Sequence, residues 1–299
     1  MKLAGAISQG SGSINEDGWG FLGTADDVTA AWVFDGVTGI NGKNLLAPGT
    51  DAAWLVSKAH GHLLKLAGLD ISLREILSRL IQSLINDFNA AVENIEISKD
   101  YDPPAACLVL VKRYGSQWKA LRLGDSCLLA RAGDGAHKIF AASPNNAFDH
   151  WLSSEAAKRR DAGVLDIKAL AAEFRPKLLQ GRKQRNTPGG YSILEAKEVA
   201  TEFAEYLDLG TPGEVLLCTD GYYRAVDHYG LHTDETLIEA SSGNGGVAGV
   251  LASLRATEAS DPTCRKYLRF KPADDATAVL LRNSDSWSQI TGQISSAPR

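Results

Sequence analysis

Two apolar runs, far apart in the sequence, each end in an aspartate followed by a glycine. Residues 33–36 read Val-Phe-Asp-Gly, and residues 217–221 read Leu-Cys-Thr-Asp-Gly. A short apolar run predicts a buried strand, and glycine after the aspartate predicts a sharp turn that leaves the carboxylate at the strand's end. Asp35 and Asp220 are therefore the first candidates for a functional site.

Three further acidic segments accompany these two aspartates. They are Asn15-Glu16-Asp17, Gly124-Asp125-Ser126 and Asp274-Asp275-Ala276-Thr277. Carboxylates that gather from several strand ends repel one another unless a cation lies between them. Because oxygen ligands with little histidine or cysteine nearby suit Mg²⁺ and Mn²⁺, the pattern indicates a divalent-metal hydrolase.

Composition narrows the class of protein. The chain has 299 residues and a formal net charge of −5, which gives no general attraction to nucleic acid or to an anionic membrane. The first ten residues lack the apolar core of a signal peptide, and no apolar run reaches the length of a membrane span. The four cysteines lack metal-type spacing, and Cys107, Cys127 and Cys218 lie in apolar runs where a free buried thiol is expected. These features favour a cytoplasmic protein.

The elements that must position the acidic residues follow from periodicity. Residues 18–23 and 28–34 predict a hairpin. Two amphipathic helices are expected next, one over residues 48–67 and one that starts at Ser72 with a capping box to Glu75. An antiparallel meander is then predicted from four short runs, at residues 105–114, 117–123, 126–132 and 137–141. Strands, paired helices and more strands indicate an α+β fold.

A mostly helical insertion is expected at about residues 143–190. Between residues 155 and 185 it carries nine Lys/Arg against four Asp/Glu, within an acidic protein. Two interpretations stay open: a solvated helical insertion, or a basic rim that receives a phosphorylated or acidic partner. We expect a single domain over residues 1–283 and a flexible C-terminal tail over residues 284–299.

Taken in order, the acidic segments resemble the metal-dependent serine/threonine protein phosphatases of type 2C, in particular their bacterial-type members. The resemblance extends to about residue 283. It rests on five segments: Asn15-Glu16-Asp17, Phe34-Asp35-Gly36-Val37-Thr38-Gly39, Leu123-Gly124-Asp125-Ser126, Cys218-Thr219-Asp220-Gly221 and Asp274-Asp275-Ala276-Thr277-Ala278-Val279.

The resemblance implies a four-layer α-β-β-α sandwich, in which two antiparallel sheets are flanked by helices and the metals lie at one end. It also implies Mn²⁺ or Mg²⁺ as cofactor, as two ions with a third, weaker one. Asp35 then bridges the two ions and the Gly36 carbonyl binds one of them. Asp17 orients the attacking water. The remaining ligands implied are Asp220 and Asp274 for the first ion, Glu16 for the second, and Asp125 with Asp220 for the third.

The chain departs from the family pattern at several positions. Gly12 stands where many members have an arginine that binds the substrate phosphate. Arg224, or Arg185 or Arg182 from the insertion, are the candidates to replace it. Arg224 also stands where many members have an acidic residue, so we expect it to weaken the third ion. Val37 stands where animal members have a histidine that acts as general acid.

Asp275 is a further departure, because many members have asparagine there. Two interpretations stay open: it supports Asp274 by hydrogen bonding, or it adds negative charge near the ions.

The resulting functional prediction is hydrolysis of phosphoserine and phosphothreonine monoesters on proteins, by water that two metal ions activate. The expected partner is a phosphorylated protein, with no nucleic acid and no membrane, and the expected state is a monomer. A catalytically weak pseudophosphatase that binds phosphoproteins is the alternative, motivated by Gly12 and Arg224. A haloacid-dehalogenase-like phosphatase is disfavoured, because Val33 and Val37 stand where that chemistry needs a second aspartate.

Overall fold

The computed structural model describes most of the chain. It covers residues 1–40, 44–46, 48–99, 101–132, 137–140, 154–155, 157–159, 161, 163, 167–197, 201–269 and 271–283. The predicted C-terminal tail and the first part of the predicted insertion lie outside these residues.

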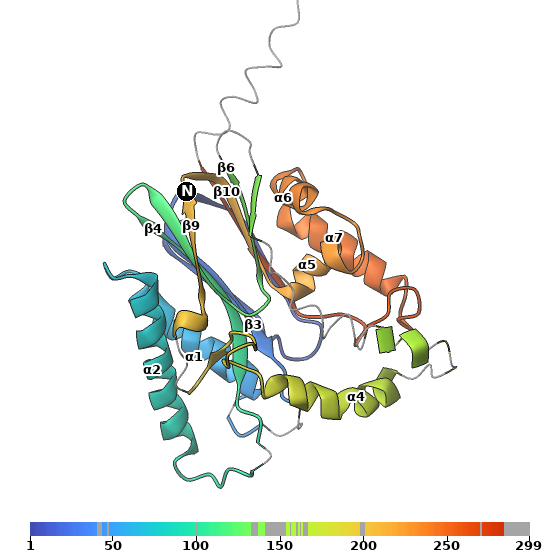
Figure 1. Cartoon of the computed structure of the whole chain (residues 1–299). Helices are drawn as coiled ribbons and strands as arrows, with labels where there is room; N and C mark the ends of the chain where they lie inside the picture. The colour runs from blue at the N-terminus through green and yellow to red at the C-terminus, as the bar shows by residue number, and fades with distance from the viewer. Residues whose placement is uncertain are drawn as a thin grey trace, which may run out of the picture.

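The described strands form two antiparallel sheets that face each other (Figure 1). The first sheet contains, in spatial order, β1 (Lys2–Gln9), β11 (Ala276–Arg282), β10 (Pro212–Cys218), β6 (Cys127–Ala132) and β7 (His137–Phe140). The second contains β2 (Gly18–Thr24), β3 (Asp27–Val37), β4 (Ala105–Tyr114), β5 (Gln117–Leu123) and β9 (Glu205–Gly210), with β8 (Leu194–Glu195) paired to β4.

Helices cover the outer face of each sheet (Figure 1). The second sheet is covered by α1 (Asp51–Leu66) and α2 (Leu73–Val92), and the first by α5 (Asp220–Asp227), α6 (Asp234–Ser242) and α7 (Gly246–Ala259). Helix α4 (Ile167–Arg182) lies at one end of the sheets, and a short 3-10 helix, η1 (Thr201–Phe203), precedes β9. The predicted α+β, four-layer α-β-β-α sandwich is therefore confirmed.

Strand alternation decides which way the functional side chains face. In β3, Trp32 and Phe34 pack with α1 and α2, whereas Val33 packs in the core between the two sheets. Since successive side chains in a strand point to opposite faces, Asp35 shares the face of Val33. The Asp35 carboxylate is therefore directed toward the space between the sheets, at the end of β3.

The start of α2 agrees with the sequence prediction, whereas the start of α1 differs from it. Ser72 is the N-cap of α2, and its hydroxyl accepts a hydrogen bond from the Glu75 amide at 3.2 Å, which is one of the two bonds of the predicted capping box. Helix α1 does not begin at Pro48: Thr50 is its N-cap and accepts from the Ala53 amide at 3.2 Å.

The predicted meander over residues 105–141 is wrong at its centre. β5 pairs with β4 and β9 in the second sheet, whereas β6 pairs with β10 and β7 in the first. The chain changes sheets at Gly124, whose φ of 80° lies in the left-handed region that glycine adopts readily. This crossover places Asp125 between the two sheets.

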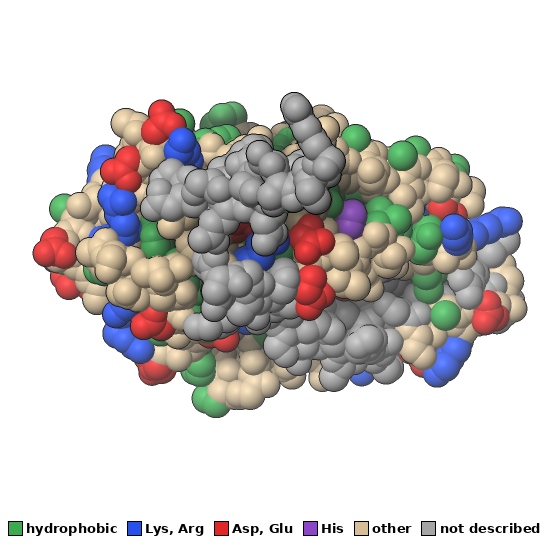
Figure 2. Space-filling model, turned by 90° about the horizontal axis from the view of Figure 1, so that it is seen from above, with side chains coloured by type: hydrophobic (Ala, Val, Ile, Leu, Met, Phe, Trp, Pro, Cys, Tyr) green, Lys and Arg blue, Asp and Glu red, His purple; other side chains and the backbone are tan. Residues whose placement is uncertain are grey.

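The remaining surface offers few functional signals. Within the described helices, none combines the length and the apolar character that a bilayer span requires. Figure 2 views the end of the molecule that carries the N-terminus, where acidic and basic side chains are interspersed among the described atoms. Among the ion pairs of the described residues, Arg113 Nη1 lies 2.8 Å from Asp27 Oδ1.

Candidate active site

The predicted acidic residues come together at one end of the two sheets. Asp35 is near the end of β3, Asp220 begins α5 directly after β10, and Asp125 lies in the β5–β6 crossover. Glu16 and Asp17 immediately precede β2, and Asp274 lies two residues before the start of β11. The fold thus brings together residues from five separate segments of the chain.

Electrostatics show how close these carboxylates are. Burial raises the pKa of Asp35 well above its usual value, and the charges of four neighbouring carboxylates raise it further: those of Asp220, Asp17, Asp125 and Asp274. Burial also raises the pKa of Asp17 to about 8, although hydrogen bonds from Thr219 and Thr277 favour the charged form and act to lower the pKa. Without a bound cation, this site therefore disfavours the charged forms of Asp35 and Asp17.

Two threonines of the first sheet hold Asp17. The Thr219 hydroxyl donates a hydrogen bond to Asp17 Oδ2 at 2.8 Å. The same hydroxyl oxygen accepts from the Thr277 amide at 3.0 Å, which links the ends of β10 and β11. Asp17 is therefore fixed by buried groups that belong to a different sheet from the strand it precedes.

Asp275 organises the loop that carries Glu16. Its carboxylate accepts hydrogen bonds from the Ser11 amide at 2.7 Å, from the Ser11 hydroxyl at 2.9 Å and from the Glu16 amide at 2.7 Å. Its own amide donates to Asp274 Oδ1 at 3.0 Å. Asp275 thus contacts Asp274 through its backbone amide, and its negative charge also raises the pKa of Asp17, so both interpretations of Asp275 stay open.

Glu16 presents an oxygen with no partner. The residue is 7 % exposed, and its Oε2 accepts a hydrogen bond from the Thr38 hydroxyl. Its Oε1 is buried and has no hydrogen-bond partner within the described part of the chain. A buried carboxylate oxygen is costly to leave unpaired, so it is suited to receive a cation.

The glycines after Asp35 and Asp220 do not form the predicted turns. β3 continues to Val37 and Asp220 opens a helix, and neither glycine has a positive φ. Close backbone approach explains them instead. A Cβ on Gly36 would lie 2.4 Å from the Glu16 carbonyl oxygen, and a Cβ on Gly221 would lie 1.9 Å from the Asp275 carbonyl oxygen. Glycine here lets the acidic segments pack against one another.

Asp274 is already paired with two cations of the chain itself. Arg224 Nη2 lies 2.7 Å from Asp274 Oδ2 and 3.5 Å from Asp220 Oδ2. Lys271 Nζ forms an ion pair with Asp274 Oδ1. Burial is the largest single effect on Asp220 and would raise its pKa, but the charges of Arg224 and Lys271 act together with hydrogen bonds to Asp35 and the Gly221 backbone, and the pKa is lowered. The Asp274 side of the site is therefore partly neutralised, whereas the Asp35 side is not.

Comparison with known proteins identifies the family. A model of the protein phosphatase 2C family matches residues 4–257. The chain belongs to this family. It is therefore a protein serine/threonine phosphatase by class, and Mn²⁺ or Mg²⁺ are the cofactors of that class. Among curated proteins, none matches the chain.

Solved structures of bacterial type 2C phosphatases share the fold. The serine/threonine phosphatase PstP from Mycobacterium tuberculosis is 15 % identical, with a TM-score of 0.51 over 92 % of this chain and 96 % of that one. The catalytic domain of PstP in complex with two manganese ions is 18 % identical, with a TM-score of 0.53 over 92 % and 95 %. Stp1 from Staphylococcus aureus is 12 % identical, with a TM-score of 0.53 over 95 % and 98 %.

The donor set of this type 2C site suits divalent ions. Asp35 is surrounded by carboxylates that raise its pKa, and Glu16 Oε1 is buried and unpaired. Both features are relieved when a hard dication binds oxygen ligands between them. Asp274 is different, because its carboxylate already forms ion pairs with Arg224 and Lys271. These two side chains would have to move before Asp274 could bind an ion.

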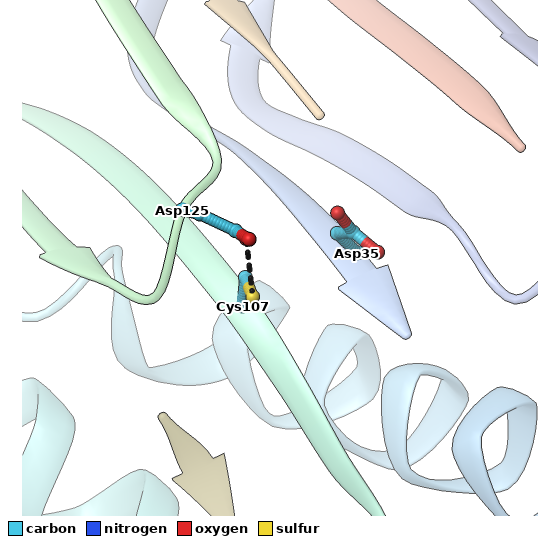
Figure 3. Close-up of side chains that lie close together, drawn as sticks. All are labelled: Asp35, Cys107 and Asp125. Atoms are coloured by element: carbon cyan, nitrogen blue, oxygen red, sulfur yellow. Dashed lines mark hydrogen bonds between the residues drawn. The ribbon is translucent and has the colours of Figure 1, made fainter. Parts of the chain in front are cut away.

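Cys107 is a residue of the site that the sequence did not single out. It lies directly opposite Asp35 in the β3–β4 register, and its Sγ donates a hydrogen bond to Asp125 Oδ1 at 3.1 Å (Figure 3). Ligand atoms of Asp35, Cys107 and Asp125 all lie within 4.8 Å of one another. Only the cross-strand register could have indicated this contact, because Cys107 is otherwise an ordinary residue of a buried strand.

We predict that the Cys107 thiol is slow to alkylate in the folded protein. Burial raises its pKa well above the usual value, and the charges of Asp125 and Asp35 raise it further. The reactive thiolate is therefore scarce at neutral pH. Mass spectrometry after iodoacetamide treatment at pH 7.5 should find Cys107 unmodified in native protein and modified in denaturant. Rapid alkylation of Cys107 in the native state would contradict the prediction that its thiol has a raised pKa.

The two insertion arginines are engaged within the fold. Arg182 Nη1 forms an ion pair with Asp102 Oδ2, and Arg185 Nη1 lies 3.1 Å from Asp102 Oδ1. Arg185 is 5 % exposed and also lies 3.4 Å from Glu195. These pairs anchor α4 to the segments next to β3 and β4. The predicted contact of Arg185 with substrate phosphate stays a prediction.

Proposed function

We propose that this chain hydrolyses phosphoserine and phosphothreonine monoesters on proteins by using a centre of two divalent ions. The observation that carries the proposal is the ring of carboxylates around Asp35, with the buried, unpaired Glu16 Oε1 beside it. Such a cluster is electrostatically unfavourable without cations and stable with them. A structural role alone gives no reason to gather these charges.

The ligands assigned to the ions follow the family pattern. In this proposal Asp35, the Gly36 carbonyl and Glu16 would hold one ion, and Asp35, Asp220 and Asp274 would hold the other. Asp125 contributes to a third, weaker site near Asp220. Bound Mn²⁺ or Mg²⁺ supplies Lewis-acid chemistry: it lowers the pKa of water and neutralises charge on the phosphoryl group.

The chain's own groups supply orientation. Asp17, whose Oδ2 is held by Thr219, is placed to accept a hydrogen bond from the attacking water and to align it. Val37 occupies the place of the general-acid histidine of animal members, so this chain provides no imidazole there to protonate the leaving alcohol.

The proposal also includes the domain organisation, the oligomeric state and the cellular compartment. We assign residues 1–283 to one phosphatase domain that acts as a monomer on phosphorylated proteins. All four cysteines are free and buried, which supports a reducing compartment such as the cytoplasm.

A pseudophosphatase is the second candidate, and one observation favours it. The pairing of Asp274 with Arg224 and Lys271 places internal cations where the first ion is expected. If these pairs persist, the site would bind a phosphoprotein without turning it over.

Phosphate release from a panel of phosphoserine and phosphothreonine peptides separates the two candidates. We expect turnover with added Mn²⁺ or Mg²⁺ and none with EDTA. Peptide binding without phosphate release under every metal condition would favour the pseudophosphatase. Turnover that is indifferent to metal would contradict the proposed centre.

We predict that Arg224 contributes more to substrate capture than to the chemical step. Arg224→Ala should raise KM for p-nitrophenyl phosphate about 10-fold, because it removes a charge-assisted hydrogen bond to the phosphate. Its effect on kcat should be smaller. An unchanged KM would remove Arg224 from the phosphate site.

Gly12 provides the matching rescue variant. A Cβ at this position meets nothing within 4 Å, and its φ is not positive, so a side chain fits there. Gly12→Arg in the Arg224→Ala background should lower KM again, because it restores the arginine that many family members carry.

A further inference from the structure

The helix of the insertion is connected to the ligand Glu16 through a short chain of contacts. Arg182, in the last turn of α4, donates from Nη2 to the Thr38 carbonyl oxygen at 2.6 Å. The Thr38 hydroxyl in turn donates to Glu16 Oε2. Thr38 follows the end of β3, three residues after Asp35. Residues 38 and 16 are far apart in sequence, so only the fold makes this connection.

The segment that carries Thr38 is held at two points. Arg182 binds its carbonyl, and Asp102 Oδ2 accepts from the Ile40 amide at 3.5 Å. Asp102 also forms ion pairs with both Arg182 and Arg185. The position of the Thr38 hydroxyl is therefore set jointly by α4 and by the residues before β4.

Glu16 is constrained by these contacts in a specific way. Its amide is held by Asp275 at 2.7 Å, and its Oε2 is occupied by Thr38. Its Oε1 is buried and is left without a hydrogen-bond partner among the described residues. A carboxylate held through one oxygen offers the other to a cation in a fixed direction, so little rotamer entropy remains to be lost on binding.

We propose that Thr38 is a positioning residue for Glu16, and that Arg182 makes this positioning depend on the docking of α4. The proposal rests on the proposed metal centre and deepens it, because it connects the insertion to divalent-ion affinity. Thr38 is exposed, so it contributes little to the hydrophobic core, and its hydroxyl is the feature that the substitutions below change.

Mn²⁺ affinity, measured from the loss of the free-ion EPR signal, tests the proposal without any activity assay. Thr38→Val should weaken binding about 10-fold to 100-fold, the range typical for partners that orient a metal ligand. Thr38→Ser should bind as the wild type does. Thr29→Val is the matched control, because Thr29 lies near the start of β3, at the end remote from Thr38, and its hydroxyl donates to the Leu22 carbonyl oxygen at 3.3 Å.

Two further comparisons show whether the effect passes through Glu16 and α4. In a Glu16→Ala background, Thr38→Val should cause no additional loss of Mn²⁺ affinity. Arg182→Gln should weaken Mn²⁺ binding by a smaller factor, whereas Lys183→Gln, an equal charge change at the next residue, should not.

The outcomes separate the two proposals. Wild-type affinity in Thr38→Val, or an undiminished loss in the Glu16→Ala background, overturns the positioning role while the metal centre stands. Failure of the wild type to bind Mn²⁺ overturns both. If the valine variant does not fold, Thr38→Ala takes its place in the same comparison.

Discussion

Asp35→Asn is expected to reduce metal-dependent phosphatase activity by more than about 100-fold, the upper end of what partners of a metal ligand contribute. Asp35 is the carboxylate whose pKa is raised by the charges of four others, namely Asp220, Asp17, Asp125 and Asp274. Asparagine keeps its shape but removes the charge that would bridge the ions. Because burial and the neighbouring carboxylates raise the pKa of Asp35 and so disfavour its charged form without metal, the same substitution should leave the thermal stability of the metal-free protein nearly unchanged.

Activity on p-nitrophenyl phosphate with saturating Mn²⁺ and a parallel melting curve measure both effects. Asp220→Asn should behave similarly in the activity assay. Asp208→Asn is a suitable control, since Asp208 is an exposed residue of β9 whose carboxylate accepts only a local bond from the Gly210 amide among those observed. Appreciable Mn²⁺-dependent turnover in Asp35→Asn would contradict the role of this residue.

The second large effect is a pH-dependent stability that metal removes. In the metal-free protein, the pKa of Asp17 is raised to about 8 and that of Asp35 is also raised well above its usual value, both mainly by burial. The folded state therefore binds more protons than the unfolded state between about pH 4 and pH 8, and stability falls as the pH rises through this window. After allowance for partial exposure, we expect a loss of about 1–2 kcal/mol between pH 6 and pH 8, or about 3–5 °C in Tm.

Saturating Mn²⁺ should abolish this fall, because the ions favour the charged carboxylates. At about 100 times its Kd, a ligand that binds only the folded state adds about 2.7 kcal/mol. Asp17→Asn should flatten the metal-free profile, whereas Asp208→Asn should leave it as in the wild type. A metal-free Tm that is constant or rises from pH 6 to pH 8 would show that the carboxylates are not coupled in this way.

The local parts of the fold were predictable from sequence. Apolar runs fixed most strands, and Ser72 with Glu75 marked the start of α2. The meander failed at Gly124 because nothing local distinguishes a tight turn within one sheet from a crossover between two sheets. The partners of β5 and β6, namely β9 and β10, lie about 80 or more residues away in sequence, and pairing over such separations has no local signature.

In the candidate site, too, residues with a local sequence signal could be predicted, whereas contacts between distant segments could not. Asp35 and Asp220 could be chosen because each follows an apolar run, and the family pattern added Glu16, Asp17, Asp125 and Asp274. Cys107 could not be found without the β3–β4 register. The contact between Thr38 and Glu16 is likewise a product of the fold.

Two basic residues of the insertion have a partner that their local charge does not indicate. The excess of basic residues predicted either a solvated segment or a docking rim, and both interpretations stay open. Arg182 and Arg185 meet Asp102, which lies some 80 residues earlier and outside the insertion. Their charges are therefore used at least in part to hold α4 beside the carboxylates.

The most direct test of the metal centre is an anomalous difference map from crystals grown with Mn²⁺. We predict one peak between Asp35 and Asp220 and a second between Asp35 and Glu16, each within about 2.3 Å of a carboxylate oxygen. Arg224 should then have moved away from Asp274. A map with no peak near Asp35, and with the Arg224–Asp274 ion pair intact, would contradict the account.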